Sequence, residues 1–172
     1  LKKYSDFVSD KVAGYISIKS QQSDNPVAID GALAVSWADL EERLLELEDY
    51  MEKHSDFPLI EQLDSIYYNY MVLYLAGADN TPAYSYDTKK YKDEVLKKIR
   101  EMTKAHEDTK TADIANDFLD IIKKDNYTFT NNAEEFINNL REKSFNNKMK
   151  NIYTKDIFTK LLPEKPRFFS KK

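Results

Sequence analysis

The apolar residues of this chain recur at steps of three and four, and this periodicity restricts the fold more than any other feature. Between positions 33 and 51 the steps alternate between four and three without a break, at Leu33, Trp37, Leu40, Leu44, Leu47 and Met51. Such spacing keeps the apolar side chains on one narrow face of a helix. Acidic residues fall on the opposite face, which we expect to meet water. Residues 33–51 are therefore predicted to form an amphipathic helix.

Other segments repeat the helical pattern. Helices are predicted over residues 2–20, 59–76, 88–105 and 111–124, and a sixth is predicted to begin at Thr130 or Asn131. The segment 59–76 is apolar on nearly every side, which is typical of a helix at the centre of a bundle. Gly77 is expected to end it in a left-handed conformation. Asp87 is expected to cap the helix that follows.

These helices predict an all-α fold, an antiparallel bundle of about six helices in residues 1–142. Their connections are short, which favours antiparallel neighbours, and no repeat of 34 or 40 residues supports a solenoid. Strand signals are nearly absent, since only residues 127–129 alternate. Residues 143–172 are predicted to be a basic, weakly structured C-terminal segment, with one or two helical turns near Ile157. The expected core includes five residues: Leu40, Leu44, Leu47, Tyr70 and Leu73.

The composition excludes several chemistries. The 172 residues include no Cys and only three Gly, so thiol catalysis, disulfides, cysteine metal sites and Gly-rich phosphate loops are ruled out. His54 and His106 have no second ligand three or four positions away, and we interpret them as solvated residues at helix ends. The loop 79–87 fails the spacing of a calcium-binding EF-hand. We therefore expect no metal, no cofactor and no enzymatic activity.

Tyrosine is abundant, with 12 residues, and several lie near Gly77. Tyr74 is close to the end of the predicted helix 59–76, and Tyr84 and Tyr86 follow in the loop after it. Tyrosine combines an apolar ring with a polar tip, which suits contacts with a protein or a carbohydrate. The three residues are predicted to form a ligand-binding surface. The alternative is a core that is simply rich in tyrosine.

The charge is divided unevenly along the chain. Residues 143–172 hold nine Lys or Arg against two acids, a net +7, whereas residues 1–142 hold 17 against 28, a net −11. Phe168 and Phe169 lie within the basic segment and are predicted to take part in a contact. One alternative is an anionic surface such as lipid or wall polymer; the other is the acidic face of the helix 33–51. Nucleic acid is disfavoured because the acidic body would repel phosphate.

The leading hypothesis is a non-enzymatic helical binding domain whose partner is a protein or a cell-surface or wall ligand. Abundant Lys, Asn, Ile and Tyr suggest an AT-rich genome, and the absence of Cys suits export. We therefore expect the exported part of a bacterial surface protein or lipoprotein, with an extracytoplasmic location. The longest apolar run, residues 70–76, is far shorter than the ~20 residues of a membrane span.

Two alternatives remain. The first is a cytoplasmic helical regulator or mobile-element protein that binds protein or nucleic acid. The second is a hydrolase whose catalytic residues meet only in three dimensions.

Overall fold

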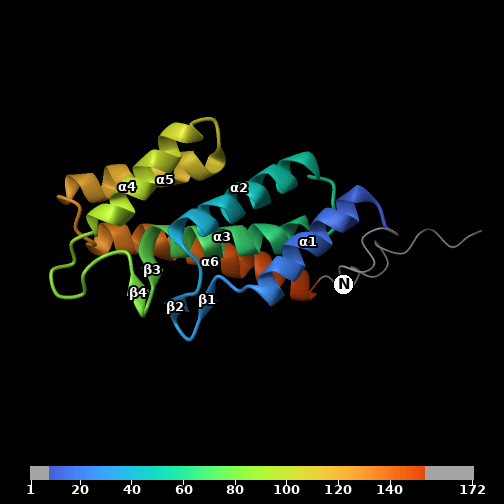
Figure 1. The fold of residues 1–172 in the computed structure, drawn as a ribbon, viewed down its shortest axis with the longest axis horizontal. Helices are drawn as coiled ribbons and strands as arrows, with labels where there is room; N and C mark the ends of the chain where they lie inside the picture. The colour runs from blue at the N-terminus through green and yellow to red at the C-terminus, as the bar shows by residue number, and fades with distance from the viewer. Residues whose placement is uncertain (1–7, 154–172) are drawn as a thin grey trace, which may run out of the picture.

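Two antiparallel helices, α3 (Ile60–Ala76) and α6 (Asn131–Tyr153), form the centre of the molecule (Figure 1). This computed structural model describes residues 8–153, with side chains up to residue 147. The Ser65 hydroxyl donates to the Ser144 carbonyl at 2.8 Å, and the Ser144 hydroxyl donates to the Ser65 carbonyl at 2.8 Å. Two small residues thus let the two helices approach closely. The prediction that residues 59–76 form a central helix is confirmed, because nine side chains of α3 are buried.

The other helices surround this pair. They are α1 (Asp10–Asp24), α2 (Trp37–Lys53), α4 (Asp93–Ala105) and α5 (Lys110–Lys124). Helix α2 packs along α3, and the hairpin of α4 and α5 lies over the opposite end of the bundle from α1 (Figure 1). The all-α bundle of about six helices is therefore confirmed. Of the five expected core residues, Leu40, Leu44, Leu47 and Tyr70 are buried, and Leu73 is partly buried.

Several helix boundaries differ from the predictions. Helix α1 begins at Asp10, where the Ser9 hydroxyl accepts a bond from the Val12 amide; residues 2–7 of the predicted helix lie outside the described residues. Helix α2 begins at Trp37, because Ser36 and Asp39 form a reciprocal capping box there. Helix α4 begins at Asp93 and not at residue 88, and Asp87 does not cap it. Its N-cap residue is Lys92, whose side chain makes no capping bond.

Two short hairpins were not predicted. Strands β1 (Ala28–Ile29) and β2 (Ala32–Leu33) pair antiparallel, as do β3 (Gly77–Ala78) and β4 (Thr81–Pro82). The first hairpin turns at Asp30 and Gly31, both with positive φ, which is the signature of a two-residue turn. The backbone N–H of Asn80 donates to the Gly31 carbonyl at 2.7 Å, so the hairpins lie side by side.

Gly77 ends α3 as predicted, but not in the predicted left-handed conformation. Its φ of 78° is combined with a ψ of −167°, which turns the chain directly into β3. The segment 127–129, the one predicted to alternate like a strand, forms only an isolated bridge between Thr128 and Lys90.

Helix α6 continues through residues 142 and 143, the predicted start of a separate C-terminal segment. The helical turns predicted near Ile157, together with Phe168 and Phe169, lie outside the described residues.

Candidate functional site

The loop between β4 and α4, residues 83–92, folds back on itself and presents its tyrosines at one end of the bundle. The Ala83 carbonyl accepts from the Lys92 amide at 3.0 Å, and Tyr84 forms a β-bridge with Tyr91. At the tip, Lys89 has a φ of 57° and its amide donates to the Ser85 carbonyl at 2.8 Å. The backbone of this loop is therefore closed by its own hydrogen bonds.

Aromatic stacking fixes Tyr84 in place. Its ring lies parallel to that of Phe129, with centroids 4.2 Å apart and planes at 8°. The ring also contacts Tyr91, a buried residue whose hydroxyl donates to the Leu75 carbonyl at 3.2 Å. Burial raises the pKa of the Tyr84 phenol, and the neighbouring Tyr86 raises it further. Tyr84 is thus a half-buried ring that its neighbours hold in place.

Tyr86 is the exposed partner of Tyr84. The two rings meet edge to face at 85°, with centroids 5.8 Å apart. The Tyr86 hydroxyl donates to the carbonyl of Asp79 at 2.6 Å, which ties the ring to the turn of the second hairpin. Half of the Tyr86 side chain, 50%, remains accessible to solvent.

Tyr74 does not join this surface, and its predicted role in ligand binding is corrected. The residue is completely buried in the bundle, where its hydroxyl donates to Glu41 Oε2 at 2.9 Å. Burial raises the pKa of this phenol, and the Glu41 carboxylate raises it further. Tyr74 is therefore a core residue. The all-round apolar character of the helix 59–76 already indicated this position.

Ile29, which sequence reasoning missed, lies on the hairpin beside the one that holds Tyr86. Only four large hydrophobic side chains in the described part of the chain are strongly exposed: Val8 at 37%, Ile29 at 53%, Tyr86 at 50% and Phe145 at 60%. Ile29 adjoins the turn at Asp30, whose carbonyl accepts from the Asn80 side chain at 2.8 Å. Asn80 is next to Asp79, which holds Tyr86. We call Ile29, Tyr84, Tyr86 and Lys89 the aromatic corner.

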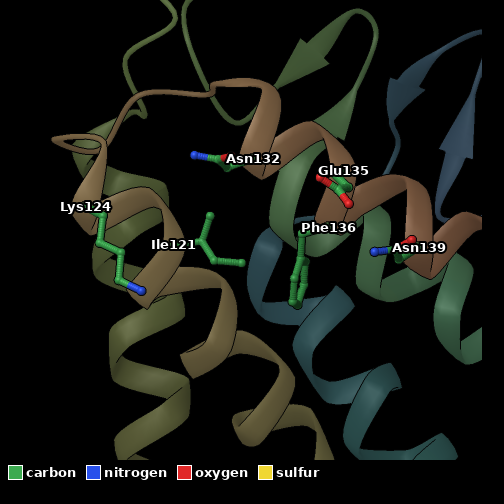
Figure 2. A pocket seen from close by; sticks show the side chains of 6 residues that line it. All are labelled: Ile121, Lys124, Asn132, Glu135, Phe136 and Asn139. Carbon is green, nitrogen blue, oxygen red and sulfur yellow. The ribbon is translucent and has the colours of Figure 1, made fainter.

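A shallow groove of about 380 Å³ runs between α5 and α6 (Figure 2). Ile121 and the Phe136 ring point into the space between the helices, with Lys124 at one end and Asn139 at the other. Asn132 and Glu135 complete the lining. The groove offers an apolar floor with mixed polar groups around it. Both apolar residues are half-buried, so they present less apolar surface than Ile29 or Tyr86.

A second groove, about 490 Å³ in volume, lies where α2, α3 and the start of α5 meet. Five carboxylates line it, together with Met51, Ile60 and Lys110: Glu48, Glu52, Glu61, Asp64 and Asp108. Glu48 is committed to the fold, because its carboxylate accepts from the amides of Lys110 at 2.6 Å and Thr111 at 2.9 Å. The Lys110 ammonium nitrogen lies 4.6 Å from the centroid of the Tyr67 ring and 4.7 Å from that of the Tyr68 ring. We call this region the acidic groove.

Among the residues that the structure describes, no side chains are gathered as a metal site would require. No cluster of three or more His, Asp or Glu side chains there has an arrangement that would hold a metal ion. His54 and His106 are the C-cap residues of α2 and α4, at helix ends as predicted. The His54 ring packs on Tyr50, with centroids 4.7 Å apart. Both histidines therefore have positions that helix termination explains.

Comparison of the chain with protein-family models, with curated proteins and with solved structures finds no match. Within residues 8–153, no helix combines the length and hydropathy that crossing a membrane requires. The aromatic corner is the strongest candidate site. There the turn at residues 79 and 80 is hydrogen-bonded both to the turn next to Ile29 and to Tyr86, so that it links two of the four exposed large hydrophobic side chains of the described residues.

Proposed function

We propose that the chain is a non-enzymatic binding domain that holds a partner protein at the aromatic corner. The observation that carries this proposal is the exposure of Ile29 and Tyr86 on two segments that are both hydrogen-bonded to the turn at residues 79 and 80. Exposed apolar side chains on a fixed scaffold are typical of interaction sites, and tyrosine is enriched there. Because the rings are held before binding, a partner would lose little entropy in ordering them.

The test compares three forms of the full-length protein: the natural chain, the double variant Ile29→Ser/Tyr86→Ser and the control Phe145→Ser. Phe145 is exposed on α6, so its replacement removes similar apolar surface elsewhere. Each form is immobilised, and the bound proteins from an envelope extract are quantified. We expect at least one protein to bind the natural chain and Phe145→Ser but to be lost from the double variant. Equal retention by all three forms would contradict the proposal.

A photo-crosslinking residue at position 86 identifies direct contact. Replacing Tyr86 by p-benzoylphenylalanine keeps an aromatic ring at the corner. The same amino acid at position 145 is the control. We expect the partner to be crosslinked from position 86 and not from position 145.

We further propose that the domain is the exported part of a bacterial surface protein or lipoprotein. The composition supports this location, since it is rich in Lys, Asn, Ile and Tyr and free of Cys. Cell fractionation followed by immunodetection tests it, with recovery in the extracytoplasmic or envelope fraction as the expected result. Recovery in the cytoplasm would instead favour the alternative, an intracellular regulator that binds protein or nucleic acid.

A further inference from the structure

The aromatic corner already holds a cation from its own chain. The Lys89 ammonium nitrogen lies 5.6 Å from the centroid of the Tyr84 ring and 5.5 Å from that of Tyr86. An ammonium or guanidinium group within about 6 Å of an aromatic centroid is attracted by the ring electrons. The two rings stand at 85° to each other, so one point in space is within this range of both.

The two rings do not depend on Lys89 for their positions. Tyr84 is stacked on Phe129, and Tyr86 is bonded through its hydroxyl to Asp79. The site would therefore keep its shape if the Lys89 side chain left it.

The Lys89 side chain, in turn, is weakly held. Among the side chains that the structure describes, its ammonium makes neither a hydrogen bond nor an ion pair, and the residue is exposed. The ammonium of the neighbouring Lys90, by contrast, donates to the Asn126 carbonyl at 2.5 Å. Lys89 can therefore swing into solvent without breaking a bond, whereas Lys90 cannot.

We propose that Tyr84 and Tyr86 form a binding site for an arginine side chain of the partner, and that Lys89 fills this site in the free protein. This inference rests on the proposed function and names the chemistry that the corner recognises. The guanidinium group is favoured because it is planar, stacks on aromatic faces and is more weakly hydrated than an ammonium. Partner binding then exchanges one cation for another.

Charge around the corner suits a cationic partner. Asp79, which is bonded to Tyr86, and Asp87, which follows it in sequence, are exposed, as is Asp30 on the turn bonded to Asn80, and residues 1–142 carry a net charge of −11. A positively charged segment would be drawn to this end of the molecule, with an attraction that weakens as salt is added.

The probe is N-acetyl-L-arginine amide, titrated into the full-length protein while the ring resonances of Tyr84 and Tyr86 are followed by NMR. The uncharged citrulline analogue has nearly the same shape and is the control ligand. We expect the arginine probe to shift both ring resonances and the citrulline probe to leave them unchanged. In Lys89→Met, which keeps the apolar stem and removes the competing charge, we expect the arginine probe to bind about 3- to 10-fold more tightly.

Lys90→Met is the matched control variant and is expected to bind the probe as the natural chain does. Tyr86→Leu is expected to lose binding while keeping the melting temperature within a few degrees. The inference is overturned if Lys89→Met binds no more tightly than the natural chain, or if citrulline binds as well as arginine. If Lys89→Met lowers the melting temperature, Lys89→Gln repeats the test with a neutral polar side chain.

The two proposals fail in different ways. If the partner is lost from Ile29→Ser/Tyr86→Ser but the arginine probe shows no effect of Lys89, the corner is a binding site and this inference alone is wrong. If the partner binds the double variant unchanged, the proposed function is wrong.

Discussion

Gly77 is the glycine at which an added side chain would come closest to backbone atoms. Its φ of 78° is one that residues with a side chain rarely adopt. A Cβ at this position would lie 2.3 Å from the Thr81 carbonyl oxygen and 2.6 Å from the Ala83 nitrogen. Both are backbone atoms, so a side-chain rotation cannot relieve the clash. We expect Gly77→Ala to lower the free energy of unfolding by at least about 2 kcal/mol, measured by urea denaturation.

Gly31→Ala is the control for that substitution. Gly31 has a similar φ of 75°, but its nearest neighbour would be the Asn80 side-chain nitrogen at 3.3 Å, which can move. We expect a smaller loss, about 1 kcal/mol. Equal losses at the two positions would show that φ alone, and not the close backbone, sets the requirement at Gly77.

The buried tyrosines predict how stability depends on alkaline pH. Burial raises the pKa values of the Tyr67, Tyr74 and Tyr91 phenols above the value of about 10 that an unfolded tyrosine has. Below pH 10 each phenol is neutral in both states, and their contribution to stability is complete. Above pH 10 the unfolded phenols ionise while the folded ones do not, so stability falls by up to about 1.4 kcal/mol per residue and pH unit.

Urea denaturation between pH 8 and pH 11 measures this dependence. We expect a flat profile up to about pH 9.5 and a steep loss above it. In Tyr67→Phe the slope should be smaller, because one titrating phenol is gone. A profile that stayed flat to pH 11 would contradict the burial of these phenols.

The tyrosines also show how far sequence could define the candidate site. Spacing identified Tyr84 and Tyr86 because they follow the end of a helix in a polar loop. It did not separate them from Tyr74, since all three are close in sequence; the packing of α2 and α4 against α3 covers Tyr74 and leaves Tyr86 open. Ile29 could not be found in this way, because it comes from a turn about 50 positions earlier that meets Asn80 only in the fold.

Among the elements, α5 has its own N-cap, since the Thr109 hydroxyl accepts from the Ala112 amide, and a carboxylate from another helix adds to it. Glu48 of α2 accepts from the Lys110 and Thr111 amides and from the Thr111 hydroxyl, the last at 2.5 Å. A carboxylate at a helix N-terminus satisfies free amides and interacts well with the helix dipole. We expect Glu48→Ala to lower the free energy of unfolding by about 1–3 kcal/mol.

Glu52→Ala is the matched control, one helical turn further along α2 and exposed in the acidic groove. We expect its effect to stay within about 0.5 kcal/mol, measured by urea denaturation beside Glu48→Ala. A loss as large as that of Glu48→Ala would indicate that general charge, rather than the cap, is responsible.

The sequence predicted helices correctly where the apolar spacing continues longest, and it misplaced helix ends where turn and capping residues determine the boundary. The stripe from Leu40 to Met51 lies within α2 as predicted, because burial of one face requires that spacing. Leu33 continues the same spacing yet lies in β2, since the Asp30–Gly31 turn and the Ser36 capping box set the boundary. Turn and cap chemistry was present in the sequence, but the apolar pattern alone does not show where a helix begins.

At the scale of the whole molecule, Leu44 tests the bundle. Its side chain is completely buried in the core. We expect Leu44→Ala to lower the free energy of unfolding by about 2–5 kcal/mol, and far-ultraviolet circular dichroism of the natural chain to be dominated by helix. A neutral substitution at Leu44, or a spectrum dominated by strand, would contradict the fold.

The division of charge predicts a role for the last residues. We expect residues 154–172, which belong to the predicted basic segment, to bind the acidic body. A chain ending at 153 should then melt at a lower temperature than the full chain. The difference should shrink between 0.1 and 1 M salt, as the Debye length falls from ~10 to ~3 Å. The cut belongs at 153 and not at 142, because a cut at 142 would remove the bonds between Ser144 and Ser65.

Equal melting temperatures would instead favour contact with an anionic surface. In that case the full chain, and not the shortened one, should be retained on vesicles that contain anionic lipid, and salt should release it. If the two chains matched in both measurements, neither role for the segment would hold.

The reciprocal bonds between Ser65 and Ser144 join positions 79 apart in the chain, and they have a consequence for synthesis. Helix α3, the most apolar of the described helices, emerges from the ribosome before α4, α5 and α6, and its most extensive contact waits for α6. Contacts of such large sequence separation form late and slow the folding of a helical protein. Until α6 arrives, the apolar side of α3 is open to other chains. The nascent protein is therefore most prone to aggregate just before α6 is made.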